Sequence, residues 1–207
     1  MPQPTGGDPQ EAVRAAHHQI GNSLQSVASL LRLKGRDAAP EAAGILLEAS
    51  RRVRVIMRLH QRLQEGVASE VRLDDLLGDV CRDVADLGML DHEVEVRADL
   101  APLTATPKIA SALAMITAEL VGNALEHGLA DRDGAIRVTL KPHRDGGRLR
   151  ISDTGAGSPS GVFAEGFGLT LVASLAHQIG ATLRRRTGRS GTVFVIHVVE
   201  LRPESRG

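Results

Sequence analysis

Aromatic residues and cysteine are the two residue classes that this 207-residue sequence mostly lacks. It has three phenylalanines and neither tryptophan nor tyrosine, so the core must be aliphatic. Stacking of bases on aromatic rings, on which single-stranded nucleic-acid sites depend, is largely unavailable. Cys81 is the single cysteine. This excludes an intrachain disulfide and a multi-cysteine zinc site, and it fits a reducing cytosol.

Net charge and long apolar runs are absent as well. The 25 basic and 25 acidic residues cancel, so no overall field steers the chain toward nucleic acid or an anionic membrane. The longest apolar run, from Ile109 to Ala118, is well short of the roughly 20 residues that span a bilayer. The polar N-terminus does not resemble a signal peptide. We therefore expect a cytoplasmic protein that binds neither nucleic acid nor membrane.

Two long helical patterns occupy the N-terminal third of the chain. From about Pro9 to Lys34, spacings of four and three alternate as in a heptad seam. The seam positions are Val13, His17, Ile20, Leu24, Val27, Leu31 and Lys34. A second pattern runs from about Pro40 to Gln64, after a turn rich in glycine and alanine. A short turn between two helices predicts an antiparallel hairpin.

A hairpin alone buries little surface and needs a partner. We expect two copies to pair as a four-helix bundle, which makes the protein a homodimer. The alternative is a hairpin packed on its own C-terminal domain. We place the boundary between the two domains in the 66–69 segment, with a helical domain over 1–68 and a second domain over 69–202.

Helices and alternating strands follow one another in the second domain. The patterns predict helices at 74–87, 107–127 and 168–179, and strands at 92–98, 135–141, 148–152, 181–186 and 192–199. Helices combined with antiparallel hairpins indicate an α+β sandwich rather than a doubly wound sheet.

Three short polar motifs in this domain can carry chemistry. Glu119, Asn123 and His127 share one face of the 107–127 helix. The carboxylate of Glu119 and the amide of Asn123 offer the oxygen ligands that magnesium prefers. Asp153 ends a strand and precedes Gly155 and Gly157, which lets the backbone turn sharply. Gly166 and Gly168 begin the next helix, where free N–H groups suit phosphate. Each motif alone is common on ordinary protein surfaces.

The order of these motifs resembles the GHKL ATPases, which include the histidine kinases. The matching elements are E-x-x-x-N (Glu119, Asn123), D-x-G-x-G (Asp153, Gly155, Gly157), G-x-G (Gly166, Gly168) and Gly191-Thr192-x-Phe194. The resemblance implies a Bergerat-type α/β sandwich with ATP and Mg²⁺ as cofactors. It implies that Asn123 binds the magnesium, Glu119 assists catalysis, and Asp153 reads adenine with support from Thr192. The glycine segments, with His127 and Leu169, complete the nucleotide site.

The first helix carries a second resemblance, to the histidine kinase class with the motif His-Arg-x-Lys-Asn-x-Leu-Gln. The chain matches it at His18, Asn22, Leu24 and Gln25. His17 falls on the heptad seam, whereas His18 falls on a polar stripe and is expected to be exposed. The resemblance implies that His18 is the phosphoacceptor.

These resemblances predict a histidine kinase that phosphorylates itself on His18 from ATP. An aspartate in the receiver domain of a response regulator would then take the phosphoryl group. The stretch from Gly157 to Gly166 is short for an ATP lid, and Gln19 cannot serve as a base. One alternative is therefore a histidine phosphotransferase that relays phosphate without using ATP. Another is a serine-directed GHKL kinase that sequesters a sigma factor.

Overall fold

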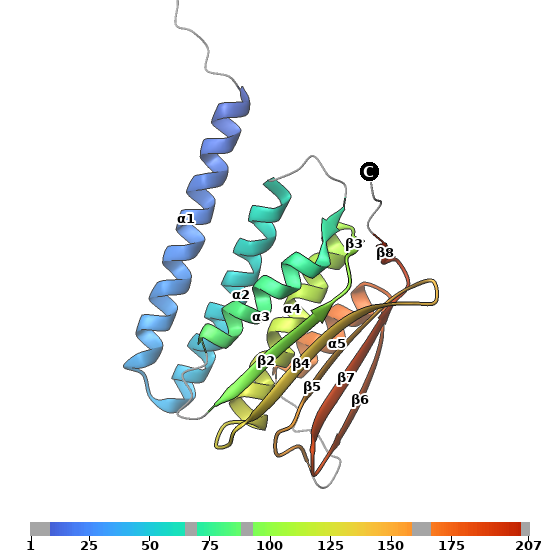
Figure 1. Ribbon diagram of the computed structural model, residues 1–207. Coiled ribbons are helices and arrows are strands. Elements are labelled where there is room, and N and C mark those ends of the chain that lie inside the picture. The colour runs from blue at the N-terminus through green and yellow to red at the C-terminus, as the bar shows by residue number, and fades with distance from the viewer. Residues whose placement is uncertain (1–8, 65–69, 88–92, 159–166, 204–207) are drawn as a thin grey trace, which may run out of the picture.

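The chain forms a helical hairpin beside a layered α/β unit (Figure 1). The computed structural model describes residues 9–64, 70–87, 93–158 and 167–203, and the side chains of the helical residues 9–18, 40–41, 62–64 and 167 also lie outside this description. Helices cover one face of a five-stranded sheet, so the predicted α+β class is confirmed. The predicted 66–69 linker lies outside the described residues.

The hairpin consists of α1 (Pro9–Arg36) and α2 (Pro40–Gln64), which run antiparallel. Ala28 is buried against α2, where the hydroxyl of Ser50 donates to its carbonyl oxygen at 3.0 Å. The predicted seam is only partly covered within one chain. Leu24 is half-buried, but Ile20 and Val27 are 47% and 45% exposed. The exposed apolar side of α1 is the part that a second copy would have to cover.

The second domain has helices on one side and strands on the other. Its helices are α3 (Leu73–Leu87), α4 (Pro107–Asn123), the π-helical turn η1 (Ala124–Gly128) and α5 (Phe167–Gln178). The large sheet contains β2 (Val94–Leu100), β4 (Gly134–His143), β5 (Gly146–Asp153), β7 (Gly191–Val198) and β6 (Thr182–Gly188), in that spatial order. In the described part of the chain, neighbouring strands of this sheet are antiparallel apart from the parallel pair β2 and β4.

A second, smaller sheet was not predicted from the sequence. It joins β1 (Val71–Arg72), β3 (Leu103–Ala105) and β8 (Arg202–Pro203). Strands of two or three residues are too short to show the period-two alternation on which strand prediction depends.

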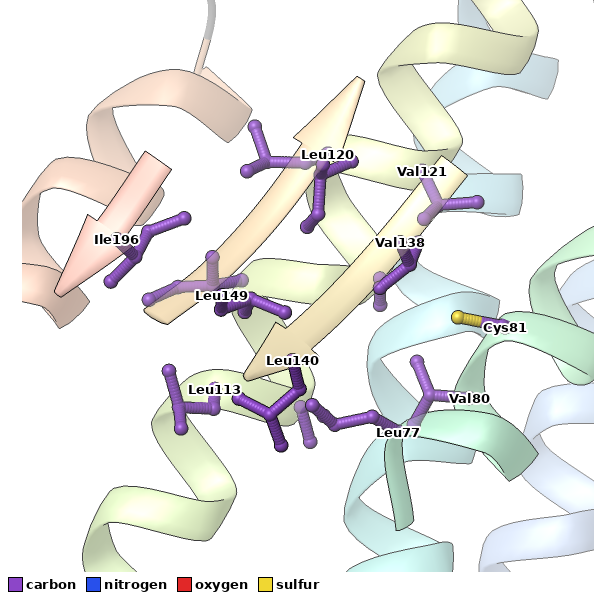
Figure 2. Close-up of a cluster of buried hydrophobic side chains, with 14 of the residues drawn as sticks. Leu77, Val80, Cys81, Leu113, Leu120, Val121, Val138, Leu140, Leu149 and Ile196 are labelled. Carbon is purple, nitrogen blue, oxygen red and sulfur yellow. The ribbon is translucent and has the colours of Figure 1, made fainter. Parts of the chain in front are cut away.

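The core lies between the helices and the sheet (Figure 2). Alternate residues of β4 and β5, among them Val138, Leu140 and Leu149, turn toward α4 because successive side chains of a strand point to opposite faces. Helix α4 is surrounded by α2, α3, α5 and the sheet, which explains its apolar character. Among the described residues, Pro107–Gly128 is the one helix apolar and long enough to cross a membrane, and 78% of its most apolar window is buried within the fold.

Helix α2 also packs on the second domain of its own chain, against α3 and α4. The buried Val55 joins the main core, and Arg58 binds Asp83 through two hydrogen bonds of 2.7 and 2.9 Å. Packing on the same chain is the arrangement that the sequence analysis placed second to dimerisation. The two are compatible, because α2 packs on the domain while the apolar residues of α1 stay exposed.

Candidate nucleotide-binding site

A cavity of about 600 Å³ lies where η1, the end of β5, β7 and the start of α5 meet the first half of α2. Seven of the predicted site residues line it: Asn123, His127, Asp153, Gly157, Gly168, Leu169 and Thr192. Residues separated by up to 69 positions in the sequence thus share one cavity. Of the other two predicted binding residues, Gly155 is not among those that line the cavity, and Gly166 lies outside the described residues.

Helix α4 changes its winding where it reaches the cavity. The N–H of Leu129 donates to the carbonyl of Ala124 at 2.8 Å, a five-residue spacing that makes η1 a π-turn. Such single wide turns are frequent at functional sites. The sequence predicted a regular helix through this segment, and its pattern carried no sign of the wider turn. Glu126 and His127 both line the cavity from this turn.

Asp153 is held in place by backbone N–H groups. Its Oδ1 accepts hydrogen bonds from the N–H of Gly155 at 2.9 Å and from that of Thr192 at 3.3 Å. Burial raises the pKa of this carboxyl, and the two N–H groups oppose that rise because they stabilise the ionised form. Thr192 therefore supports Asp153 through its backbone, while its hydroxyl lies 3.1 Å from the hydroxyl of Thr187.

The glycines of the D-x-G-x-G motif pack against backbone rather than against open space. A Cβ on Gly155 would lie 2.3 Å from the carbonyl oxygen of Gly128. Gly157 has a φ of +56°, and a Cβ there would lie 1.9 Å from the carbonyl oxygen of Gly188. These glycines let the chain leaving β5 pass close to η1 and to the β6–β7 turn, which shapes the cavity.

Glu119 does not line the cavity but lies beside it. Its side chain is 1% exposed, and a Cβ on Gly168 would lie 2.9 Å from its Oε2. Arg52 of α2 binds both oxygens of this carboxylate, with Nε donating to Oε1 at 2.8 Å and Nη2 to Oε2 at 3.1 Å. The predicted catalytic carboxylate is thus neutralised by a residue of the hairpin.

The part of the cavity lining that α2 supplies was not predicted from the sequence. Gly44, Ile45, Glu48 and Arg51 line that side. Arg51 is 3% exposed and forms a salt bridge with Glu126 of η1. Its signal in the sequence was the set of arginines lying off the apolar stripe of α2, which by itself looks like a solvated face.

His18 lies in α1, away from the cavity, and its side chain is outside the described residues. The contact between Ser50 and Ala28 sets the register of the hairpin, so His18 is level with about residue 60 of α2. The nearest cavity residue on α2, Arg51, is nine residues away, or about 13 Å along the helix axis. The predicted phosphoacceptor and the nucleotide site are therefore not together in this arrangement.

The oxygen donors at the cavity suit a magnesium ion that is carried in with a nucleotide. The described residues contain no cluster of three or more His, Cys, Asp or Glu side chains that could hold a metal by themselves. Magnesium usually takes one or two protein oxygens and completes its shell with phosphate oxygens and water. The amide oxygen of Asn123, which lines the cavity, is a donor of this kind.

Comparison with known protein families gives two matches along the chain. Residues 16–87 match the family described as "Histidine kinase". Residues 109–202 match the family described as "Histidine kinase-, DNA gyrase B-, and HSP90-like ATPase". The two matches cover the hairpin with α3 and the nucleotide domain in turn.

Curated relatives carry the same description. The chain is 32% identical over 196 residues to the sensor histidine kinase PdtaS of Mycobacterium tuberculosis, covering 90% of this chain and 39% of that protein. It is 33% identical over 204 residues to PdtaS of Mycolicibacterium smegmatis, covering 94% and 40% respectively. The chain thus spans about two fifths of the length of these relatives.

Among solved structures, the histidine kinase domain of the blue-light-activated kinase EL346 from Erythrobacter litoralis has a similar fold. It superposes with a TM-score of 0.71 over 88% of this chain and 96% of that domain, at 19% identity. At this identity the likeness concerns the fold, and it includes the helical hairpin together with the nucleotide domain.

Proposed function

The chain belongs to the histidine kinases, and we propose that it binds ATP with magnesium in the cavity and phosphorylates itself on His18. An aspartate of a response-regulator receiver domain would then accept the phosphoryl group. The observation that carries this proposal is the meeting of Asn123, Asp153, Gly168 and Thr192 around one cavity of about 600 Å³. That volume falls in the range of small-molecule sites.

The residues that line the cavity suit the different parts of a nucleotide. Asp153, when ionised, accepts a hydrogen bond from an exocyclic amine such as that of adenine. Apolar side chains that line the same cavity, among them Leu169 and Phe194, would cover the faces of a flat ring. The start of α5 at Gly168 offers N–H groups to phosphate oxygens. Asn123 would hold the magnesium, which neutralises phosphate charge during transfer.

The transfer step requires His18 to present an unprotonated ring nitrogen. That nitrogen forms a bond to the γ-phosphorus while the bond from phosphorus to the β–γ bridging oxygen breaks, and ADP leaves. The other ring nitrogen then releases its proton. Glu119 assists, either as the proton acceptor or by positioning the metal. A neutral imidazole suits this role near pH 7 because the ordinary pKa of histidine is about 6.5.

A second copy of the chain is proposed as a structural partner. Four apolar side chains of α1 support it, because they are about half exposed: Ile20 (47%), Val27 (45%), Leu30 (57%) and Leu33 (55%). Pairing of two hairpins as a four-helix bundle would cover them. It would also offer each nucleotide site a second His18. We propose that the protein works in the cytosol, where ATP and response regulators are found.

One observation favours the phosphotransferase alternative. His18 lies about 13 Å along α2 from the nearest cavity residue of that helix, so the hairpin could serve a separate kinase without any use of the cavity. ATP binding separates the two functions, because a relay that has lost ATP use needs no nucleotide affinity.

Calorimetric titration with ATP and magnesium tests the proposal. The wild-type chain is expected to bind, and Asn123→Ala is expected to lose the magnesium-dependent part of the affinity. Lys108→Ala, at the opposite end of α4, is the matched control and should bind as wild type does. If the folded wild-type chain shows no nucleotide binding, the kinase proposal is wrong and the relay is favoured.

A further inference from the structure

Four charged side chains join the hairpin to the nucleotide domain beside the cavity. Arg51 binds Glu126 and Arg52 binds Glu119, and we name these four residues the arginine clamp. Both arginines belong to α2, and both carboxylates belong to the α4–η1 segment that carries Asn123. The clamp therefore connects the helix pair that bears the phosphoacceptor with the segment that bears the proposed metal ligand.

The Arg52 guanidinium binds a carboxylate that lies on the same helix as the proposed metal ligand. Glu119 is one helical turn before Asn123, and Arg52 already binds both of its oxygens, at 2.8 and 3.1 Å. A buried carboxylate needs a positive partner. In this arrangement the arginine supplies the charge that a metal carried by the nucleotide would otherwise supply.

Arg52 has a second carboxylate at hand. Glu48, one turn earlier on α2, also binds its Nη2. Arg52 can therefore give up Glu119 and remain paired with Glu48, while Glu119 turns to a cation. An exchange that leaves no charge unpaired avoids the large penalty for breaking a buried ion pair outright.

Arg51 packs against α4 in an arrangement that leaves one of its buried donors without a partner in the described part of the chain, which favours its release. A Cβ on Gly122 would lie 2.5 Å from its Cζ, so the absence of a side chain at Gly122 is what lets the guanidinium approach the helix. Its Nε is buried and has no hydrogen-bond partner among the described residues. A buried unsatisfied donor destabilises the arrangement that holds it.

The distance between His18 and the cavity shows why the arginine clamp matters for phosphoryl transfer. While α2 is clamped to the domain, the His18 of the same chain stays about 13 Å along the hairpin axis from the cavity. Transfer to that histidine requires the domain to leave α2. The arginine clamp must therefore be released before or during this movement of the domain.

We infer that Arg51 and Arg52 are positioning residues of the kinase reaction, through which α2 and the magnesium complex of the nucleotide compete for Glu119. This rests on the proposed function, because it takes the cavity to be the ATP site. Competition is reciprocal. The magnesium complex weakens the hold of α2 on the domain, and loss of the clamp strengthens binding of the magnesium complex.

The test is the calorimetric affinity of the full chain for a non-hydrolysable ATP analogue, with magnesium and again with EDTA. Arg52→Gln is expected to bind the magnesium complex about tenfold more tightly than wild type, with no change in EDTA. Arg58→Gln is the matched control, since it removes an equal charge and a two-point ion pair from α2 but leaves Glu119 held. Arg32→Gln on α1 controls for charge alone. Equal tightening by Arg58→Gln would overturn the inference.

Gly122→Ala provides a second variant that changes no charge. Its methyl group would displace Arg51, whereas alanine is a better helix former than glycine, so α4 should remain folded. Because Arg51 adjoins Arg52 on α2, its displacement is expected to loosen the hold of Arg52 on Glu119 and so to tighten binding of the magnesium complex, by less than Arg52→Gln does. If wild type binds the nucleotide and neither variant binds its magnesium complex more tightly, the inference fails and the proposed function stands. If none of the folded chains binds nucleotide, the proposed function itself fails.

Discussion

The Oδ1 atom of Asp153 accepts a hydrogen bond from the backbone N–H of Gly155 at 2.9 Å. This contact fixes the direction of the carboxylate at the end of β5, in a setting where burial raises its pKa above the ordinary 3.8. The ionised form is thus oriented by the backbone but disfavoured by burial. Acidification should therefore affect nucleotide binding through this group.

We predict that ATP affinity falls on acidification at a pH above 3.8, because a protonated Asp153 is a weaker acceptor for the adenine amine than the carboxylate is. Because the pKa of Asp153 is higher in the folded chain than in the unfolded chain, this group contributes to the free energy of unfolding below its unfolded-state pKa. That contribution is lost as the pH rises through its folded-state pKa. Titration of affinity against pH, with Asp153→Asn as the comparison, checks this. A wild-type curve as flat as that of Asp153→Asn would contradict it.

Replacement of Gly155 should damage the fold around the cavity. A Cβ there would lie 2.3 Å from a backbone oxygen of Gly128, which cannot rotate away as a side chain can. We expect Gly155→Ala to lower the free energy of unfolding by about 1–3 kcal/mol, the usual cost of overpacking. The control is Gly188→Ala, since a Cβ at Gly188 would meet nothing within 4 Å. Urea unfolding that finds the two variants equally stable would refute this explanation.

Cys81 should be inert in the folded chain. Its side chain is 3% exposed, and burial raises its pKa to about 12, so almost no thiolate exists at pH 8. We predict that a colorimetric disulfide reagent reacts with Cys81 only when the chain is unfolded by denaturant. Rapid reaction of the native chain would mean that α3 does not pack as described.

The exposed side of α1 should control the oligomeric state. Leu30 is 57% exposed, so Leu30→Glu should change the stability of one folded chain by less than about 0.5 kcal/mol. Sedimentation of the wild-type chain is expected to show a dimer, and Leu30→Glu is expected to shift it toward monomer. Gln25→Glu adds the same charge on the polar side of α1 and should remain dimeric. A monomeric wild-type chain would contradict the bundle.

The strands and helices that the sequence predicted well are those with long, regular patterns. Helix α2 begins at Pro40 and ends at Gln64 as predicted, and the alternation in β4 and β5 marked the face that packs on α4. The order of short motifs predicted the residues of the nucleotide site, and the fold brings seven of them to one cavity. By contrast, the parallel pairing of β2 with β4 depends on where the chain crosses over, and no local pattern records it.

The contribution of α2 to the site could not be predicted for a physical reason. An arginine on a solvated helix face and an arginine that binds a buried carboxylate have the same neighbours in sequence. Arg52 and Glu119 lie 67 positions apart, and only the docking of α2 on α4 brings them together. The π-turn at η1 is similar, since the hydrogen bond from Leu129 to Ala124 arises in a segment with an ordinary helical pattern.

The central claim is that His18 receives the γ-phosphate of ATP, and adjacent histidines allow a direct test. Wild type, His18→Gln and His17→Gln are incubated with γ-labelled ATP and magnesium, and the label is tested for stability in acid and in base. We predict that wild type and His17→Gln carry labelled phosphate that is lost in acid and kept in base, and that His18→Gln carries none. Equal labelling of His18→Gln and wild type would contradict it.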